Sequence, residues 1–187
     1  MSWRVLAGQA FRRYFVNTVF DSTFVAMGIV IGSSITPEAS VRTVVSTMLA
    51  ASVALGISTG TSVYEAEKVE AEIRLKELER AMLTELSGTE AKRALDVSRY
   101  FVVSVNVLAP PAVFGLTAAP FLLADSLVVN TFPAAYVSIA IAIGVLFTVG
   151  AYLGRLAGGR SWLKGLRMAL LGLGTFAAIW LIQNLFP

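Results

Sequence analysis

The run FRRYFVNTVFDSTFVAMGIVIGSSIT, residues 11–36, decides the fold, because it is long enough to cross a bilayer as one helix. Its only acid is Asp21, ten residues into the run. A carboxylate at membrane depth costs roughly 2.5–3.5 kcal/mol on insertion scales, and ionisable residues at that depth commonly mark ion or proton pathways. The run therefore predicts a transmembrane helix with a functional acid. The alternative is a protonated carboxyl that hydrogen-bonds to a neighbouring helix.

One narrow stripe of this helix carries Asp21. At 100° per residue the stripe holds Asn17, Asp21, Phe24, Gly28, Gly32 and Ile35. Gly28 and Gly32 form a GxxxG pair, which lets another backbone approach closely. Both a helix-packing face with one polar pair and a pore or substrate face at a helix or subunit contact fit this stripe.

The composition extends the membrane assignment to the whole chain. Of the 187 residues 56% are hydrophobic and 14% are charged, against about 25% charged in soluble domains, and the mean hydropathy is +0.74. Five apolar runs exceed the ~20 residues that a span needs: 11–36, 41–64, 100–124, 132–154 and 163–186. We predict an all-α integral membrane protein with five transmembrane helices. Residues 1–64 hold helices one and two, 65–99 form a charged cytosolic helical region, and 100–187 hold helices three to five.

The basic residues follow the membrane topology. With five spans, every lysine and arginine except Arg42 falls on one side of the bilayer. The positive-inside rule then predicts a cytosolic N-terminus and an external C-terminus, in a prokaryotic plasma membrane or an organelle membrane. Topology thus explains the net charge of +3, and no nucleic-acid partner is expected.

The chain contains no cysteine and no histidine, which excludes disulfides and thiolate or imidazole chemistry. Oxygen ligands remain, and these suit Mn²⁺, Mg²⁺, Ca²⁺ and Fe²⁺. Beyond Asp21 the spans offer no second titratable group for acid–base work, and no phosphate-binding glycine loop, nucleophile elbow or metalloprotease motif occurs. We therefore predict a protein that is not an enzyme and has no covalently bound cofactor.

The second span is rich in small and hydroxyl residues. Met48, Ser52, Gly56 and Thr59 share one face, and Gly56 with Gly60 forms another GxxxG pair, which favours close helix packing.

No glycine or proline interrupts the chain from Tyr64 to Gly88, so the second helix is predicted to continue into the cytosol. Its apolar stripe would pack on a helix over 89–96 or on a partner chain, and comprises Leu75, Leu78, Met82 and Leu86. Its glutamates allow two interpretations. One is a solvated helix with i,i+4 pairs such as Glu70–Arg74 and Glu72–Lys76. The other is a carboxylate cluster that gathers divalent cations, with Glu65, Glu67, Glu70, Glu72 and Glu79 as candidate ligands.

The third span contains Asn106, the pair Pro110–Pro111 and Pro120. Each proline removes a backbone donor and frees a carbonyl one turn earlier, so this helix is predicted to be kinked or locally unwound. The freed carbonyls would coordinate cations, or be satisfied by neighbouring helices and water. The glycines of the fourth span, at 144, 150 and 154, are interpreted as packing positions.

Four segments together resemble the vacuolar iron transporter family, which includes nodulin-21-like proteins and short prokaryotic members. They are FVNTVFDSTFVAMGIVIGSS (15–34), ASVALGISTGTSVYEAEKVEAE (51–72), LAPPAVFGLTAAPFLL (108–123) and RSWLKGLRMALLGLGTFAAIWLI (160–182). The resemblance implies a homodimer that exports Fe²⁺ or Mn²⁺ from the cytosol in exchange for protons, along a path at the dimer interface. By position, the family's first-helix aspartate falls on Asp21, its second-helix methionine on Thr59 and its second-helix glutamate on Ala51.

Under this resemblance Asp21 binds the ion or the exchanged proton, while Asn17, Thr59 and Asn106 supply neutral oxygens. Ser52 and Pro110 complete the expected path, and bending at the proline pair permits alternating access. Two alternatives remain open. One is a non-transporting membrane scaffold or regulatory subunit with the same fold, and the other is a transporter of a different cation.

Overall fold

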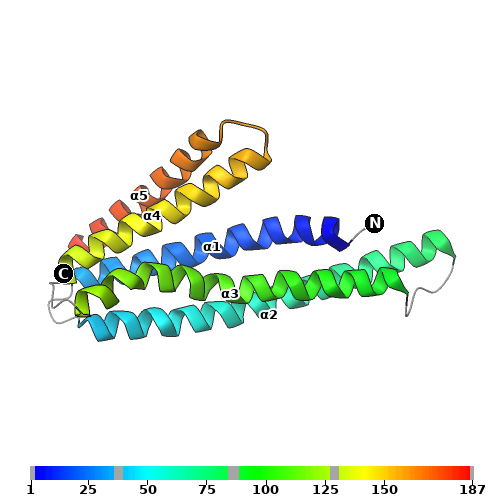
Figure 1. The fold of residues 1–187 in the computed structure, drawn as a ribbon, viewed down its shortest axis with the longest axis horizontal. Helices are drawn as coiled ribbons and strands as arrows, with labels where there is room; N and C mark the ends of the chain where they lie inside the picture. Colours follow the sequence, from blue (N-terminus) through cyan, green and yellow to red (C-terminus); the bar gives the residue numbers. More distant parts are fainter. Residues whose placement is uncertain (1–2, 36–39, 84–88, 127–130, 186–187) are drawn as a thin grey trace. The chain divides into compact units, whose positions relative to one another are not determined.

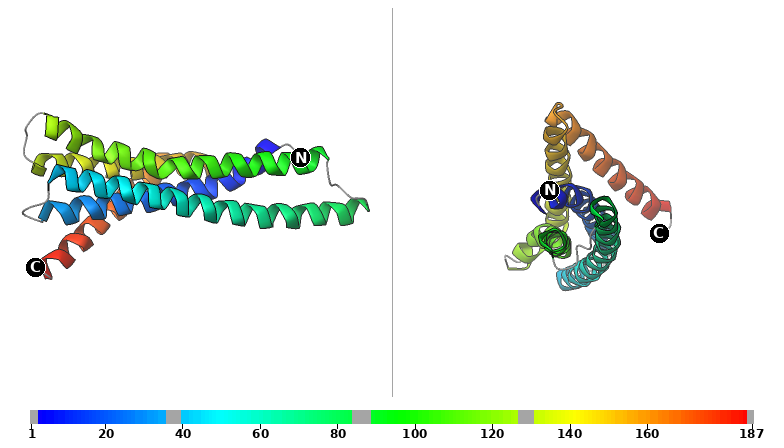
Figure 2. Two further views of the ribbon diagram at one scale, coloured as in Figure 1. Left: turned by 90° about the horizontal axis from the view of Figure 1, so that it is seen from below. Right: turned by 90° about the vertical axis from the view of Figure 1, so that its right-hand side faces the viewer.

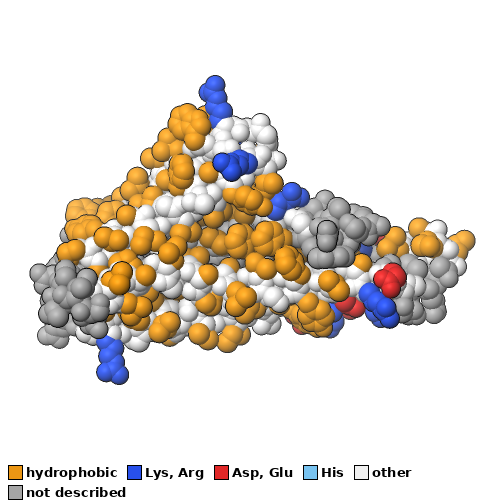
Figure 3. Space-filling view, viewed as in Figure 1, with side chains coloured by type: hydrophobic (Ala, Val, Ile, Leu, Met, Phe, Trp, Pro, Cys, Tyr) orange, Lys and Arg blue, Asp and Glu red, His pale blue; other side chains and the backbone are white. Residues whose placement is uncertain are grey.

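The computed structural model describes residues 3–35, 40–83, 89–126 and 131–185. They form five α-helices (Figure 1): α1 (Trp3–Ile35), α2 (Val41–Met82), α3 (Glu90–Ser126), α4 (Thr131–Leu156) and α5 (Ser161–Leu185). Each helix contains a segment long and apolar enough to cross a membrane. Figure 3 shows hydrophobic side chains over most of the helix surface in view, as a lipid environment requires. The described residues are thus all-helical, with five helices long and apolar enough to span a membrane, which agrees with the predicted all-α membrane protein.

The chain forms two compact units. Unit 1 comprises Met1–Thr18 and Ala54–Pro110, and unit 2 comprises Val19–Val53 and Pro111–Pro187. Helices α1, α2 and α3 each contribute residues to both units, whereas α4 and α5 belong to unit 2 alone.

Unit 1 is built from the first half of α1, the second half of α2 and the first half of α3. Its core consists of Ala10, Val63 and Val102, one from each helix, with Phe11, Tyr14 and Val103 packed around them. Within this unit α2 and α3 run antiparallel (Figure 2), and the rings of Tyr64 and Tyr100 lie 6.4 Å apart. A Cβ added at Gly60 would collide with the side chain of Val107, so α2 and α3 approach closely there. A close approach at Gly60 is what the predicted packing role requires.

Unit 2 has a separate apolar core between α1, α4 and α5. Met27 and Ile31 of α1 pack against Ala142 and Leu146 of α4, and Phe176 and Ile179 of α5 flank them. Glycines hold α4 and α5 close together. A Cβ at Gly150 would lie 2.8 Å from the Lys164 carbonyl oxygen, and one at Gly154 would lie 2.6 Å from the Ser161 Cα. The packing interpretation is thus confirmed at these two positions, whereas a Cβ at Gly144 would meet nothing within 4 Å.

The turn between α4 and α5 depends on Gly158, whose φ of 65° lies in the left-handed region. The Gly159 N–H donates to the Gly154 carbonyl (3.2 Å) and the Gly158 N–H to the Arg155 carbonyl (3.1 Å). This pair of bonds is a Schellman motif, which ends α4 and lets the chain reverse into α5.

The continuation of the second helix past Tyr64 is confirmed, since α2 is unbroken from Val41 to Met82. The separate helix predicted over 89–96 is wrong: these residues open α3, because no glycine or proline stands between Glu90 and Pro110 to end the helix. The apolar stripe of α2 is only partly covered. Leu75 lines a cleft with Leu95, Leu78 and Met82 are exposed, and Leu86 lies outside the described residues.

Local unwinding at the proline pair does not occur either, because α3 stays helical from Glu90 to Ser126. The boundary between the two compact units nevertheless falls between Pro110 and Pro111. The contact of the carbonyl freed by Pro110 with a neighbouring helix is described below.

Candidate functional site

Asp21 lies on α1 within the membrane-span candidate Ala10–Ser33 and is exposed on this chain. The next two residues point the other way, since Ser22 and Thr23 are 1% and 0% exposed. The Thr23 hydroxyl donates to the Val19 carbonyl at 2.6 Å, which satisfies its polarity within α1. None of the ion pairs in the described part of the chain involves Asp21. A carboxylate exposed to lipid on a membrane span would be costly.

The other members of the Asp21 stripe fall into two groups. Asn17 is exposed, whereas Phe24, Gly28 and Gly32 are half-buried. A Cβ built on Gly28 would meet nothing within 4 Å, so none of the described helices fills the space there. The side chain of Ile35 lies outside the described residues.

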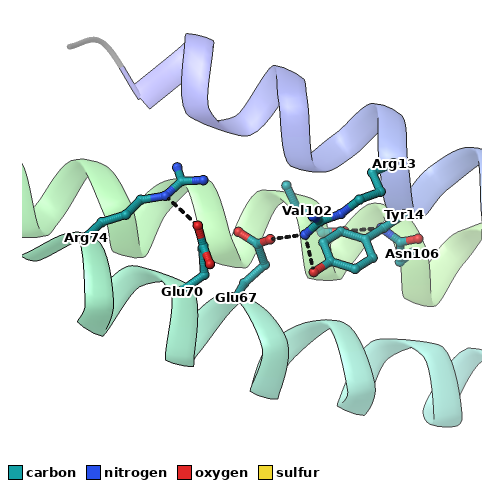
Figure 4. Close-up of polar contacts among 7 residues, drawn as sticks. All are labelled: Arg13, Tyr14, Glu67, Glu70, Arg74, Val102 and Asn106. Atoms are coloured by element: carbon teal, nitrogen blue, oxygen red, sulfur yellow. Dashed lines mark hydrogen bonds and ion pairs between the residues drawn. The ribbon is translucent and has the colours of Figure 1, made fainter.

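A buried polar cluster joins all three helices of unit 1. Asn106 of α3 is 0% exposed, and its Oδ1 accepts a hydrogen bond from the Thr18 hydroxyl of α1 at 2.7 Å. Its Nδ2 donates to the Val102 carbonyl at 2.8 Å (Figure 4). Thr59 of α2 lies 3.3 Å from the Asn106 carbonyl oxygen. We call Thr18, Thr59 and Asn106 the polar triad.

Pro110 explains why Thr59 is needed in the triad. In a regular helix the N–H of residue 110 would donate to the carbonyl of Asn106, and proline has no N–H. The Thr59 hydroxyl has one proton to donate, and its two acceptors are the Leu55 carbonyl of its own helix at 2.7 Å and, as the longer alternative, the Asn106 carbonyl at 3.3 Å. The freed carbonyl therefore has a hydroxyl of a neighbouring helix within hydrogen-bonding distance, in line with one of the two expectations for this span.

The triad brings together two of the predicted path residues, Thr59 and Asn106, but their polar atoms bond to protein groups in this conformation. Ser52 belongs to unit 2 and donates to the Leu49 carbonyl of its own helix at 2.8 Å. Thr18 was not predicted. Its hydroxyl lies about 100° around α1 from Asn17, so the stripe that singled out Asp21 excluded it.

Unit 1 also contains charged side chains on α1 and α2, in addition to the polar triad. Arg13 of α1 lies 3.8 Å from the Glu67 carboxylate of α2, and it also donates to the Tyr14 hydroxyl at 2.7 Å (Figure 4). Glu67 is only 12% exposed, so this pair anchors a nearly buried carboxylate. The predicted i,i+4 pair between Glu70 and Arg74 is confirmed at 3.0 Å.

The candidate metal ligands of α2 are not assembled into a cluster. Within the residues that the structure describes, no group of three or more acidic side chains could hold a metal ion. Arginines engage Glu67 and Glu70, whereas Glu65 and Glu72 are exposed and Glu79 is half-buried. The arrangement favours the salt-bridged helix over the cation-gathering cluster.

The triad gives a stability prediction. Asn106→Leu keeps a similar volume but removes the acceptor of Thr18, so we expect the free energy of unfolding to fall by about 1–2 kcal/mol, the upper range for an interhelical hydrogen bond in a membrane. Denaturant titration of the protein in detergent micelles measures this. Ser104→Ala is the control, because Ser104 is exposed on the same helix and bonds only to the Tyr100 carbonyl. Equal free energies of unfolding for Asn106→Leu and wild type would show that the triad does not stabilise the fold.

The five apolar helices of the described residues are consistent with an all-α membrane protein. No family model matches it, and no solved structure matches it significantly. It is 26% identical over 183 residues to an uncharacterized protein of Methanocaldococcus jannaschii. This similarity covers 96% of the present chain and 92% of that protein, so it is not confined to one apolar span.

Proposed function

We propose that this protein exports a divalent metal cation, Fe²⁺ or Mn²⁺, from the cytosol in exchange for protons, along a path around Asp21 at a homodimer interface. The exposure of Asp21 on a membrane-spanning helix carries the proposal. Left against lipid, this carboxylate would oppose insertion by roughly 2.5–3.5 kcal/mol. A second copy of the chain and a bound cation would remove that cost.

Two-fold symmetry makes Asp21 a workable cation ligand. An isologous interface presents the same patch from both chains, and with Asp21 near the two-fold axis it would bring two Asp21 carboxylates to one site. Two hard oxygen ligands suit Mn²⁺ and Fe²⁺, and the exposed Asn17 would add an amide oxygen from each chain. Transport also needs a ligand set weak enough to release the ion, which two carboxylates with neutral oxygens provide.

The surface beside Asp21 supports the dimer. The space next to Gly28 is empty in one chain, and the GxxxG pair of Gly28 and Gly32 suits close approach of another helix. The resemblance of four segments to the vacuolar iron transporter family supports the same arrangement and the same class of ion.

In this proposal the charged second half of α2, the start of α3 and the N-terminus lie in the cytosol, and the C-terminus is external. The distribution of basic residues supports that orientation. The acidic side chains in view in Figure 3 gather over the charged parts of α2 and α3.

A second candidate is a membrane scaffold or regulatory subunit that has the fold without transport. The saturation of Thr59 and Asn106 by protein groups favours it, as does the scattered placement of the α2 glutamates. It predicts neither metal flux nor stabilisation by metal ions.

Reconstitution separates the two candidates. We expect wild-type proteoliposomes to take up Mn²⁺ or Fe²⁺ saturably, with a proton flux in the opposite direction, as measured with trapped metal- and pH-sensitive dyes. We also expect Mn²⁺, and not K⁺ at the same ionic strength, to raise the thermal midpoint of the purified protein. Uptake no faster than in protein-free liposomes, together with an unchanged midpoint, would favour the scaffold.

A further inference from the structure

A cleft of about 190 Å³ lies between α2 and α3 of unit 1, beyond the Tyr64–Tyr100 ring pair. Each helix contributes four residues at the spacing i, i+3, i+4, i+7, which is one helix face. The lining residues are Lys68, Ala71, Glu72 and Leu75 from α2 and Lys92, Leu95, Asp96 and Arg99 from α3. The lining thus combines three apolar side chains with five charged ones, and it includes neither Asp21 nor a residue of the polar triad.

Positive charge is in excess in this cleft. Three cationic side chains face two carboxylates, and one of these, Asp96, already pairs with Arg99 at 3.0 Å. In the described part of the chain neither Lys68 nor Lys92 takes part in an ion pair. Two ammonium groups therefore remain available to an anion that enters the cleft.

Arg99 gives the second observation. Its side chain is 13% exposed, and the guanidinium carbon lies 5.1 Å from the ring centroids of both Tyr64 and Tyr100. Its Nε is buried and has no hydrogen-bond partner among the described residues. A buried donor without an acceptor is costly, and a charged one more so. The cleft is thus lined by a guanidinium held in place by Asp96 and two tyrosine rings, beside two available ammonium groups.

We propose that this cleft binds the phosphate group of an anionic ligand, with Arg99 as the fixed donor and Lys68 and Lys92 closing around the phosphate. Guanidinium and ammonium groups are the usual protein ligands of phosphate. The volume is below the ~300 Å³ at which sites for drug-sized ligands begin, so a small group is favoured over a nucleotide.

Two sources of such a phosphate are open, a lipid headgroup and a free phosphate compound. Tyrosines concentrate at the headgroup level of a bilayer, and the Tyr64–Tyr100 pair stands where the apolar half of α2 meets its charged half. A basic cleft just beyond such a pair is placed to meet the phosphates of anionic lipids.

The test uses the full-length protein in neutral detergent and two double variants. Lys68→Gln with Lys92→Gln removes two cations from the cleft. Lys76→Gln with Arg93→Gln removes two cations from the same helices outside it. Native mass spectrometry measures the binding of phosphatidylglycerol, with phosphatidylcholine as the neutral comparison. We expect selective binding of phosphatidylglycerol by wild type and by the control variant, and about thirtyfold weaker binding by the cleft variant, since a lysine near an anionic lipid contributes about a fivefold gain.

Inorganic phosphate distinguishes the sources. If millimolar inorganic phosphate raises the thermal midpoint of wild type but not that of the cleft variant, the cleft takes a free phosphate compound. If phosphatidylglycerol alone binds, the source is the membrane. The proposal is overturned if neither probe binds, or if both double variants lose phosphatidylglycerol equally. Metal flux plays no part in these measurements, so their outcome is independent of the transport proposal.

Discussion

Replacing Asp21 by asparagine is expected to lower the initial rate of Mn²⁺ uptake by at least about 100-fold, which corresponds to roughly 2.7 kcal/mol. Asparagine keeps the size of the side chain and one oxygen, but it lacks the charge that attracts a divalent ion and the group that binds the exchanged proton. Both copies of the chain lose their carboxylate, so the proposed site would lose all of its negative charge. Proteoliposomes with a trapped Mn²⁺-sensitive dye measure the rate.

The variant should remain folded, because removing a carboxylate from a membrane span lowers the cost of insertion. Glu90→Gln is the matched control, since the Glu90 side chain is 92% exposed at the start of α3 and its removal also deletes one carboxylate per chain. We expect its uptake rate to stay within about twofold of wild type. A normal uptake rate for Asp21→Asn would contradict the central role of this residue in transport. If the variant does not fold, Asp21 is a structural residue instead.

The spans were predictable because their signal is local. An apolar run longer than a bilayer is thick leaves few alternatives to a helix, and the uninterrupted run from Tyr64 to Met82 correctly predicted the long α2. The error over 89–96 came from reading a change in polarity as a change of element. Polarity shows which solvent a helix meets, whereas only a glycine, a proline or a cap ends it.

The contacts in the candidate site were predictable only where they are close in sequence. Glu70 and Arg74 stand one turn apart, so helix geometry alone brings them together. The bond from Thr18 to Asn106 and the pair of Arg13 with Glu67 join different helices. Periodicity gives the face on which a residue lies, but it does not say which helix packs on that face or at what height. The polar triad could not be predicted without knowing which helices pack together and at what height.

The same limit applies to the small-residue pairs. The sequence places Gly28 and Gly60 in identical GxxxG patterns, yet Gly60 packs against Val107 and Gly28 faces empty space. A GxxxG pattern permits the close approach of another helix, but it does not show which helix that is. Only the structure separates a contact made within one chain from a surface left open, and the open one lies on the helix that carries Asp21.

Gly165→Leu is expected to lower the free energy of unfolding by about 3 kcal/mol, the upper end for an oversized residue in a packed interface. A Cβ at Gly165 would lie 2.9 Å from the Phe147 carbonyl oxygen and 2.9 Å from a ring carbon of the same residue. The ring can rotate, but the carbonyl belongs to the backbone of α4, so α4 and α5 would have to separate. Denaturant titration in detergent micelles measures the loss.

Gly174→Leu is the matched control on the same helix. A Cβ at Gly174 would meet nothing within 4 Å, and leucine favours a helix by about 1 kcal/mol over glycine. The two substitutions should therefore have different effects on the free energy of unfolding. Gly174→Leu leaves it unchanged or slightly raises it, whereas Gly165→Leu lowers it. Equal losses at both positions would mean that any bulk on α5 is harmful, and the close contact at Gly165 would then not be what holds the α4–α5 hairpin together.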